Sequence, residues 1–244
     1  MKKIRLDTLL VRRGYFPDEA AALRAVLARE VKVDDAYAAN AAILVSPDAE
    51  IVVKGRERFV SRGGYKLQAA LDGFGQAVKG MRCLDIGASS GGFTDCLLQA
   101  GAAAVVCVDV NYGQLAWSLR QDARVTVFER TNIRHADPDE LGAPFDMIVA
   151  DLSFIGLAQL APVFARFAKA GTVFIGLVKP QFESLLGETD HGVVRDPSVR
   201  QRVVDEVASA LRESSFSPMG VIESPLKGHD GNVEFLIRAV FEKA

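Results

Sequence analysis

The spacing of apolar residues in the first quarter of the chain predicts two short helices that lead into a small sheet. Apolar positions recur three and four residues apart from Arg5 to Gly14, and again after the helix-start signal P-D-E at 17–19. The period changes to two at 31–33 and 50–53, which is the alternation of short strands. The residues expected to face the core of the helix pair are Leu6, Leu9, Leu10, Leu23, Val26 and Leu27.

The charge of this first segment is only mildly basic. Residues 1–60 hold 11 Lys and Arg against 9 Asp and Glu, a net of +2, whereas the whole chain has 29 against 31, a net of −2. Residues 61–244 therefore hold 18 against 22, a net of −4. An RNA partner would have to bind through local clusters, such as the basic stretch K-G-R-E-R-F-V-S-R-G-G at 54–64.

From residue 83 onwards, strand-like apolar runs alternate with helix-compatible stretches. The runs lie at 83–86, 105–110, 125–128, 145–150 and 172–178. Regular alternation is typical of a doubly wound, mostly parallel α/β sheet. After a helix near 200–212, two further strands, 219–223 and 233–241, are joined by a short Gly-rich connection. That connection predicts a hairpin, and hence a seven-stranded sheet whose last strand is antiparallel.

A loop of small residues follows the first of these strands. The segment L-D-I-G-A-S-S-G-G-F-T-D at 84–95 would let a nucleotide-like ligand approach the backbone closely. It does not match G-x-G-x-x-G, because Ser89 replaces a glycine, and the G-K-S/T of a P-loop is absent. G-A-S-S-G also matches the hydrolase pattern G-x-S-x-G, in which Ser89 would be a nucleophile served by His135, His191 or His229.

The residues around this loop favour S-adenosylmethionine as the ligand. D-I-G-x-x-x-G-G-F-T is similar to the cofactor loop of class I methyltransferases, where the acidic residue and the glycines contact the methionine part. Asp109 ends the second strand, where a carboxylate can accept hydrogen bonds from ribose hydroxyls. NAD would use a similar carboxylate, so a dehydrogenase remains an alternative at this point.

Four charged residues are expected to meet at one edge of the sheet. Asp151 and Lys179 end the fourth and fifth strands, and Glu234 begins the antiparallel last strand, which starts where its parallel neighbours finish. Lys66 lies on a helix that leads into the first strand. Each residue alone is more simply explained as surface charge. Four of them together at the ligand-binding edge indicate a catalytic site.

This group suits methyl transfer to a ribose hydroxyl. A 2′-hydroxyl is too weak an acid to ionise unaided, and a lysine accepts its proton only when the lysine is neutral. We expect Lys179 to be that base, with the like charge of Lys66 helping it to lose its own proton. Asp151 and Glu234 oppose this effect, so they are expected mainly to orient the lysines and to balance the charge of the site.

Over nearly its whole length the chain resembles the TlyA family, called hemolysin A in older naming. In that family an S4-like RNA-binding domain precedes a methyltransferase domain similar to FtsJ/RrmJ. The segments that carry the resemblance are R-L-D-x-L-L-x-x-x-G from 5, S-R-G-G-Y-K-L at 61–67, D-I-G-A-S-S-G-G-F-T-D at 85–95, V-D-V-N-Y-G-Q-L at 108–115, E-R-T-N-I-R at 129–134, A-D-L-S-F-I at 150–155, L-V-K-P-Q-F-E at 177–183, G-V-V-R-D at 192–196 and G-N-V-E-F-L at 231–236.

The resemblance implies a domain organisation, a cofactor and a substrate. It implies an RNA-binding domain at 1–60, a linker at about 54–63 and a methyltransferase domain at 64–244 that uses S-adenosylmethionine. The substrate would be a cytidine 2′-hydroxyl in ribosomal RNA. Because both ends of the chain are compact, we favour the large-subunit 23S RNA over the 16S RNA.

The resemblance also assigns residues to roles. The family's catalytic tetrad falls on Lys66, Asp151, Lys179 and Glu234. The residues expected to hold the cofactor are Asp85, Gly87, Ala88, Ser89, Gly91, Gly92, Phe93, Thr94, Asp109, Asn132, which lies where the adenine edge is read, and Asp151. Those expected to contact RNA are Lys2, Lys3, Arg5, Arg12, Arg13, Arg24 and Arg62.

Composition and cysteine usage narrow the remaining classes. A content of 49% hydrophobic and 25% charged residues fits a folded protein, and neither a signal peptide nor a membrane span is expected. Cys83, Cys96 and Cys107 show no C-x-x-C spacing, so we expect no metal site, no disulfide framework and a cytoplasmic location. No stable protein partner is implied. A membrane-active hemolysin and a non-catalytic RNA-binding assembly factor remain as alternatives.

Overall fold

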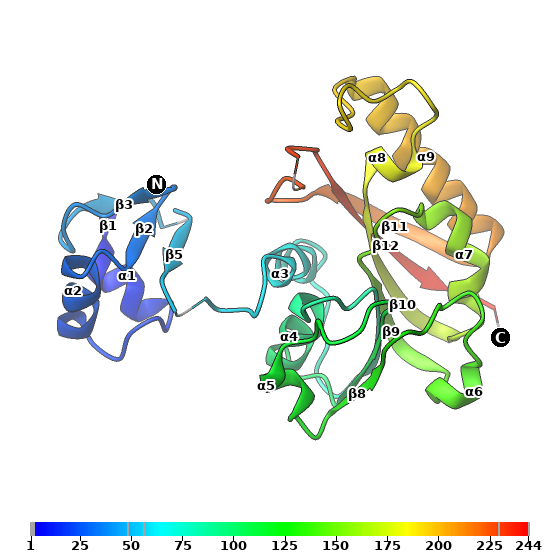
Figure 1. The fold of residues 1–244 in the computed structure, drawn as a ribbon, viewed down its shortest axis with the longest axis horizontal. Helices are drawn as coiled ribbons and strands as arrows, with labels where there is room; N and C mark the ends of the chain where they lie inside the picture. Colours follow the sequence, from blue (N-terminus) through cyan, green and yellow to red (C-terminus); the bar gives the residue numbers. More distant parts are fainter. Residues whose placement is uncertain (1–2, 48, 56, 229, 244) are drawn as a thin grey trace. The chain divides into compact units, whose positions relative to one another are not determined.

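The structure is a computed structural model that describes residues 3–47, 49–55, 57–228 and 230–243. The chain divides into two compact units, Met1–Arg58 and Phe59–Ala244 (Figure 1). Lys2, expected to contact RNA, and His229, considered as a partner of Ser89, lie outside the described residues.

The first unit contains two helices and two small antiparallel sheets. One sheet has the order β3-β2-β5, and the other pairs β1 with β4. Asp18 begins the second helix as its N-cap, since its side chain accepts a hydrogen bond from the Ala21 amide. The elements are β1 (Ile4–Arg5), α1 (Leu6–Arg12), α2 (Glu19–Leu27), β2 (Val31–Val33), β3 (Ala36–Tyr37), β4 (Leu44–Val45) and β5 (Ile51–Val53).

The core of the first unit differs from the predicted one in its second helix. The leucines of α1 are buried as predicted, but Leu23 is 44% exposed and Leu27 is 70% exposed. The buried face of α2 consists instead of Ala22, Ala25 and Val26. Small residues at the contact let a helix approach its neighbours closely. Because α2 packs through this small-residue face, Leu23 and Leu27 point toward solvent.

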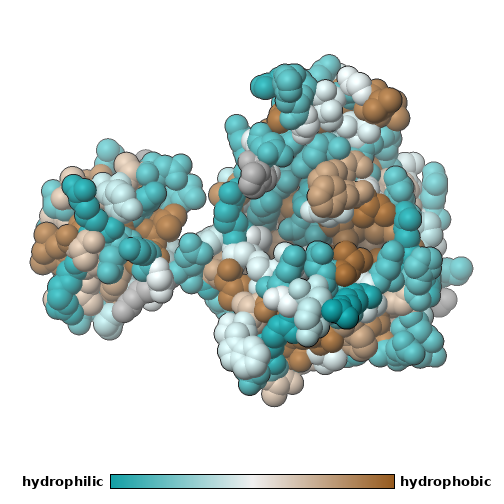
Figure 2. Space-filling model, viewed as in Figure 1, coloured by the Kyte–Doolittle hydropathy of each residue, from teal (hydrophilic) through white to brown (hydrophobic). Residues whose placement is uncertain are grey.

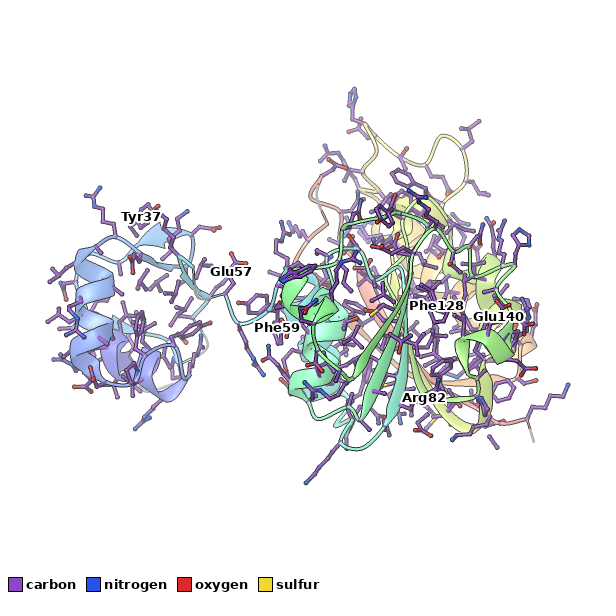
Figure 3. The ribbon with its side chains drawn as sticks, turned by 60° about the horizontal axis from the view of Figure 1, so that its bottom comes forward. Tyr37, Glu57, Phe59, Arg82, Phe128 and Glu140 are labelled. Atoms are coloured by element: carbon purple, nitrogen blue, oxygen red, sulfur yellow. The ribbon has the colours of Figure 1, made fainter. Side chains whose placement is uncertain are left out.

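The boundary between the units falls inside the predicted linker, but part of that linker belongs to the second unit. Phe59, which Figure 3 labels, is only 1% exposed. Its ring packs edge-on against Tyr65, with ring centroids 5.1 Å apart. The Val60 amide donates a hydrogen bond to Asp95 Oδ2 at 2.9 Å. From Phe59 onwards the chain is therefore a packed part of the second unit, because a buried aromatic ring fixes it there.

The second unit is built on one seven-stranded sheet with the order β11-β12-β10-β9-β6-β7-β8. β12 runs antiparallel to both of its neighbours, and the β10-β9-β6-β7-β8 pairings are all parallel, as predicted. The strands are β6 (Arg82–Ile86), β7 (Ala104–Val108), β8 (Val125–Phe128), β9 (Phe145–Ala150), β10 (Ala168–Val178), β11 (Phe216–Glu223) and β12 (Phe235–Phe241).

Helices cover both faces of this sheet, so the unit has three layers (Figure 1). One face packs against α3 (Gly63–Gly73), α4 (Gly92–Gln99) and α5 (Trp117–Arg120). The opposite face packs against α6 (Pro138–Leu141), α7 (Leu157–Ala165) and α9 (Pro197–Glu213). A separate apolar cluster fills each side, which is why the central strands are apolar along their whole length and do not alternate.

The carboxyl ends of the parallel strands form one edge of this sheet. In Figure 3, Phe128 ends β8 at that edge and Arg82 begins β6 at the opposite one. The single-turn helix α8 (Pro180–Glu183) follows β10 directly. β12 begins at Phe235, so Glu234 immediately precedes the strand and lies beside the carboxyl end of β10, where Phe235 pairs with Val178.

Candidate active site

Two ion pairs, formed by the four residues of the predicted tetrad, lie at the carboxyl edge of the sheet. Lys66 Nζ lies 2.5 Å from Glu234 Oε2, and Lys179 Nζ lies 2.6 Å from Asp151 Oδ1. Each pair joins residues that are distant in sequence. The four residues therefore lie at one edge of the sheet as two ion pairs. The sequence predicted that they share this edge but not how they pair.

The two pairs differ in their access to solvent. Lys66 on α3 and Glu234 before β12 are both buried, and the Glu234 carbonyl also accepts a hydrogen bond from the Ser224 amide. Lys179 is the N-cap residue of α8, and its amine also donates to Ser153 Oγ at 3.3 Å. Asp151 and Lys179 keep partial exposure, so theirs is the pair more accessible to solvent.

The glycine loop is shaped by close approach to other parts of the protein. Gly87 has φ +83°, and a Cβ there would meet the Asp151 carbonyl oxygen. The Ala116 amide donates to the Ser90 carbonyl and fixes the middle of the loop. The loop therefore lies against the backbone of Asp151, at the end of β9. The predicted cofactor loop and the Lys179–Asp151 pair are thus neighbours.

Asp85 lies beneath this loop and not on its surface. Its carboxyl is fully buried, and Oδ2 accepts a 2.6 Å hydrogen bond from Thr94 Oγ1. Burial raises the pKa of Asp85 to about 7, with smaller contributions in the same direction from Asp151 and Asp109. Thr94 also contacts the Cys107 thiol at 3.0 Å. This polar group supports the loop from below.

Asp109, at the end of β7, holds the two loops that flank the predicted cofactor site. Its Oδ2 accepts from the Ser89 amide at 2.7 Å, and its Oδ1 accepts from the Asn111 amide at 2.8 Å. Each carboxylate oxygen keeps a further acceptor site, since it has two lone pairs. The carboxylate can therefore accept ligand hydroxyl groups while it orders the loops.

A cavity of about 420 Å³ opens beside these residues. This volume suits a nucleoside-sized ligand. Figure 2 shows apolar side chains gathered in a recess at this edge of the second unit. Of the residues predicted to hold the cofactor, those that line the cavity are Gly87, Ser89, Asp109, Asn132 and Asp151. Those that do not line it are Asp85, Ala88, Gly91, Gly92, Phe93 and Thr94, which shape the loop or pack beneath it.

Several residues of the site were not singled out from the sequence. Phe154 is 92% exposed, has φ +67° and lies 5.5 Å from the Phe182 ring, centroid to centroid. Ser153 and Ile133 also line the cavity. The segment A-D-L-S-F-I contained a signal for Phe154, namely an aromatic residue three positions after a strand-end aspartate. Its exposure depends on the turn and could not be predicted.

The structure gives the predicted RNA-contacting residues different surroundings. Arg5 forms an ion pair with the buried Asp7, and Arg13 donates to the carbonyls of Pro47 and Ala49. Arg62 donates to the Lys227 carbonyl at 2.8 Å. These three side chains have intramolecular hydrogen bonds as well as exposed surface. Those with exposed side chains and no such contact among the described residues are Lys3, Arg12 and Arg24.

The geometry does not favour the hydrolase interpretation of the glycine loop. Ser89 has φ +49°, but its hydroxyl contacts Gln114 Oε1 at 3.3 Å, and no hydrogen bond joins it to a histidine among the described residues. Cys83, Cys96 and Cys107 are buried, and no disulfide bond joins them. In the part of the chain that the structure describes, no group of three His, Cys, Asp or Glu side chains is arranged to hold a metal ion.

The fold and this site define a class of protein. The strand order, the glycine loop beneath a nucleoside-sized cavity and a lysine–carboxylate pair at its wall are the features of an α/β methyltransferase. The family model of the FtsJ-like methyltransferases matches residues 59–241. The chain therefore belongs to the FtsJ-like methyltransferases.

Over its full length the chain belongs to the TlyA family. It is 47% identical over 239 residues to the 16S/23S rRNA (cytidine-2′-O)-methyltransferase TlyA of Mycobacterium tuberculosis, an alignment that covers 97% of this chain and 89% of that protein. It is 34% identical to hemolysin A of Brachyspira hyodysenteriae, covering 96% and 98% of the two chains. A solved structure from Streptococcus thermophilus, provisionally described as a hemolysin, matches with a TM-score of 0.76 and 37% identity over 100% of this chain and 90% of that one.

These comparisons decide between the alternatives left open by the sequence. The TlyA relative is named for methyl transfer, and the FtsJ-like model covers nearly all of the second unit, so the dehydrogenase and the non-catalytic assembly factor are not favoured. The hemolysin name occurs among relatives of the same family. No helix in the described residues is long and apolar enough to cross a membrane.

Proposed function

We propose that this chain transfers a methyl group from S-adenosylmethionine to the 2′-hydroxyl of a cytidine in ribosomal RNA. The observation that carries the proposal is the Lys179–Asp151 pair, because Asp151 also lines the cavity. A hydroxyl that reaches Lys179 therefore lies next to whatever occupies that cavity. This proximity is what a direct methyl transfer requires.

The residues around the cavity fit S-adenosylmethionine. Asp109 would accept hydrogen bonds from the ribose hydroxyls, and Asn132 would lie at the adenine edge. The backbone of Gly87 and Ser89 would face the methionine part, with Asp85 supporting the loop from below. When bound, the cofactor would supply an electrophilic methyl group; the protein's own residues position the acceptor and manage its proton.

The tetrad residues would divide this work between the two ion pairs. Lys179, in the form whose amine has already lost its own proton, would take the proton of the 2′-hydroxyl, and Asp151 and Ser153 would hold the amine in place. Lys66 and Glu234 form an ion pair of their own. We assign Lys66 and Glu234 to holding α3 and the start of β12 together behind the site.

The carrier of the target ribose is proposed from the relatives and from the first unit. The relative with 47% identity is named for both 16S and 23S RNA. We therefore keep 23S RNA as the first substrate to test and 16S RNA as the second. The first unit, in which α1 and α2 are followed by β2 to β5, would bind the RNA as the S4-like domain predicted from the sequence. Work on ribosomal RNA would place the protein in the cytoplasm.

The decisive test combines binding and mapping. Calorimetry should detect S-adenosylmethionine binding to the full chain, and mapping of 2′-O-methyl groups should show a new cytidine mark on 23S or 16S RNA after incubation. We expect Lys179→Ala to lower the methylation rate at least about 100-fold while the cofactor Kd changes less than about twofold. Retained activity in this variant would rule out Lys179 as the base. A lack of detectable S-adenosylmethionine binding by the unchanged chain would contradict the proposed enzymatic activity.

A further inference from the structure

Glu183, at the end of α8, bonds the start of a different helix. Its Oε1 accepts a hydrogen bond from the Leu157 amide, the first residue of α7, and the carboxylate also accepts from the Ala158 amide. The N-cap residue of α7 is Gly156, which has no side chain to satisfy these amides. Glu183 therefore caps α7 from outside the helix.

The glycine at position 156 leaves room for this contact. A Cβ at Gly156 would fall on the Glu183 carboxylate, with both Oε1 and Oε2 too close. The backbone at Gly156 has φ −76°, which any residue can adopt. Space for the carboxylate, and not backbone conformation, is thus the reason that glycine fits here.

The capping contact joins the two loops that carry the exposed ion pair. α7 begins directly after the segment Asp151–Gly156, and Glu183 ends the segment that starts at Lys179. Across the same two segments lie the 2.6 Å Lys179–Asp151 contact and the 5.5 Å contact between the Phe154 and Phe182 rings. Of these links, the Glu183 contact is made to backbone amides, so it fixes the main chain and not only side chains.

We propose that Glu183 is a positioning residue for methyl transfer: it sets the distance between the Asp151 loop and the Lys179 loop. This inference rests on the proposed function. It does not require Glu183 to touch the cofactor or the RNA, and Glu183 is not among the residues that line the cavity. Burial raises the pKa of Glu183, and the hydrogen bonds from the α7 amides oppose this shift.

Two substitutions of Glu183 separate positioning from charge. Glu183→Gln keeps an oxygen that can accept from the Leu157 amide, so we expect kcat within about threefold of the unchanged chain. Glu183→Ala leaves the amides without their cap and frees the loops, and we expect kcat to fall roughly 10- to 100-fold. KM for RNA and the calorimetric Kd for S-adenosylmethionine should change less than about threefold.

A third substitution perturbs the same contact from the other side. Gly156→Ala would displace the Glu183 carboxylate, and it should lower kcat to a similar extent as Glu183→Ala. In the double variant the second change should cost little, because the contact is already lost. The matched control is Asp137→Ala, which removes the N-cap of α6, a helix with no residue in the cavity lining. It should lower the melting temperature without lowering kcat.

The outcomes distinguish this proposal from the proposed function. If the unchanged chain methylates no ribosomal RNA, the proposed function fails and this inference fails with it. If the unchanged chain is active, three results would each overturn the positioning role alone: Glu183→Ala with unchanged kcat, Asp137→Ala with an equal loss of kcat, or fully additive effects of Glu183→Ala and Gly156→Ala.

Discussion

At the scale of single residues, Asp85 shows how burial changes the role of a side chain. The resemblance of its loop to the cofactor loop of class I methyltransferases predicts a cofactor contact, but the carboxyl is enclosed under the loop and its pKa is raised to about 7, chiefly by burial. The Thr94 hydrogen bond opposes this shift without cancelling it. In the unfolded chain the pKa is the ordinary 3.8, so the folded protein binds this proton more tightly.

This difference predicts a pH-dependent stability. The contribution of protonated Asp85 to the free energy of unfolding is complete below about pH 4 and is lost as the pH rises to about 7. This contribution is at most about 4 kcal/mol. We expect the melting temperature of Asp85→Asn, relative to the unchanged chain, to increase steadily from pH 5 to pH 7 and then level off. Asp205→Asn, at an exposed position, is the control. A difference that stays constant with pH would contradict the role of Asp85.

At the scale of secondary-structure elements, glycines let α3 and α4 pack in direct contact. A Cβ at Gly92, the first residue of α4, would meet Ser61 Oγ and lie 2.8 Å from the Gly64 amide nitrogen. A Cβ at Gly64 would in turn fall on the Phe59 ring. The helix that carries Lys66 and the helix that follows the glycine loop are thereby fixed against each other. The sequence shows these glycines only as a small-residue motif.

A pair of alanine substitutions tests this packing. We expect Gly92→Ala to lower the free energy of unfolding by about 1–3 kcal/mol, because the Gly64 backbone cannot move aside freely. Gly63→Ala is the matched control, since a Cβ there has its nearest neighbour at 3.5 Å and should cost little. Urea unfolding of both variants measures the difference. Equal free energies of unfolding for the two variants would show that the structure accommodates a Cβ at Gly92 without loss of stability.

At the scale of the whole molecule, the two units share a short connection whose second half is part of the methyltransferase domain. Phe59 is fully packed in the second unit, although the basic stretch around it suggests a passive linker. Loss of a buried phenylalanine side chain costs about 3–5 kcal/mol. The position of a truncation within this stretch should therefore decide whether the second unit stays stable.

Truncated chains provide the measurement at this scale. Removal of residues 1–58 should leave cofactor affinity within about threefold and weaken RNA binding at least about tenfold, because the proposed RNA-binding unit is missing. Removal of residues 1–60 should also lower the melting temperature, since Phe59 is lost. Calorimetry, filter binding and thermal unfolding distinguish these effects. Unchanged RNA affinity in the shorter truncation would contradict the role assigned to the first unit.

The sequence by itself determined the α/β class, the strand positions and the sheet edge shared by Asp151, Lys179 and Glu234, because strand periodicity and the parallel topology fix which residues share an edge. It placed Lys66 only on a helix that leads into the first strand. Only the tertiary structure decided how these charges pair, that Asp85 faces inward, that α2 buries alanines and that Glu183 caps α7. These features depend on contacts between distant segments and on the space that each side chain finds there. Local spacing carries no information about either.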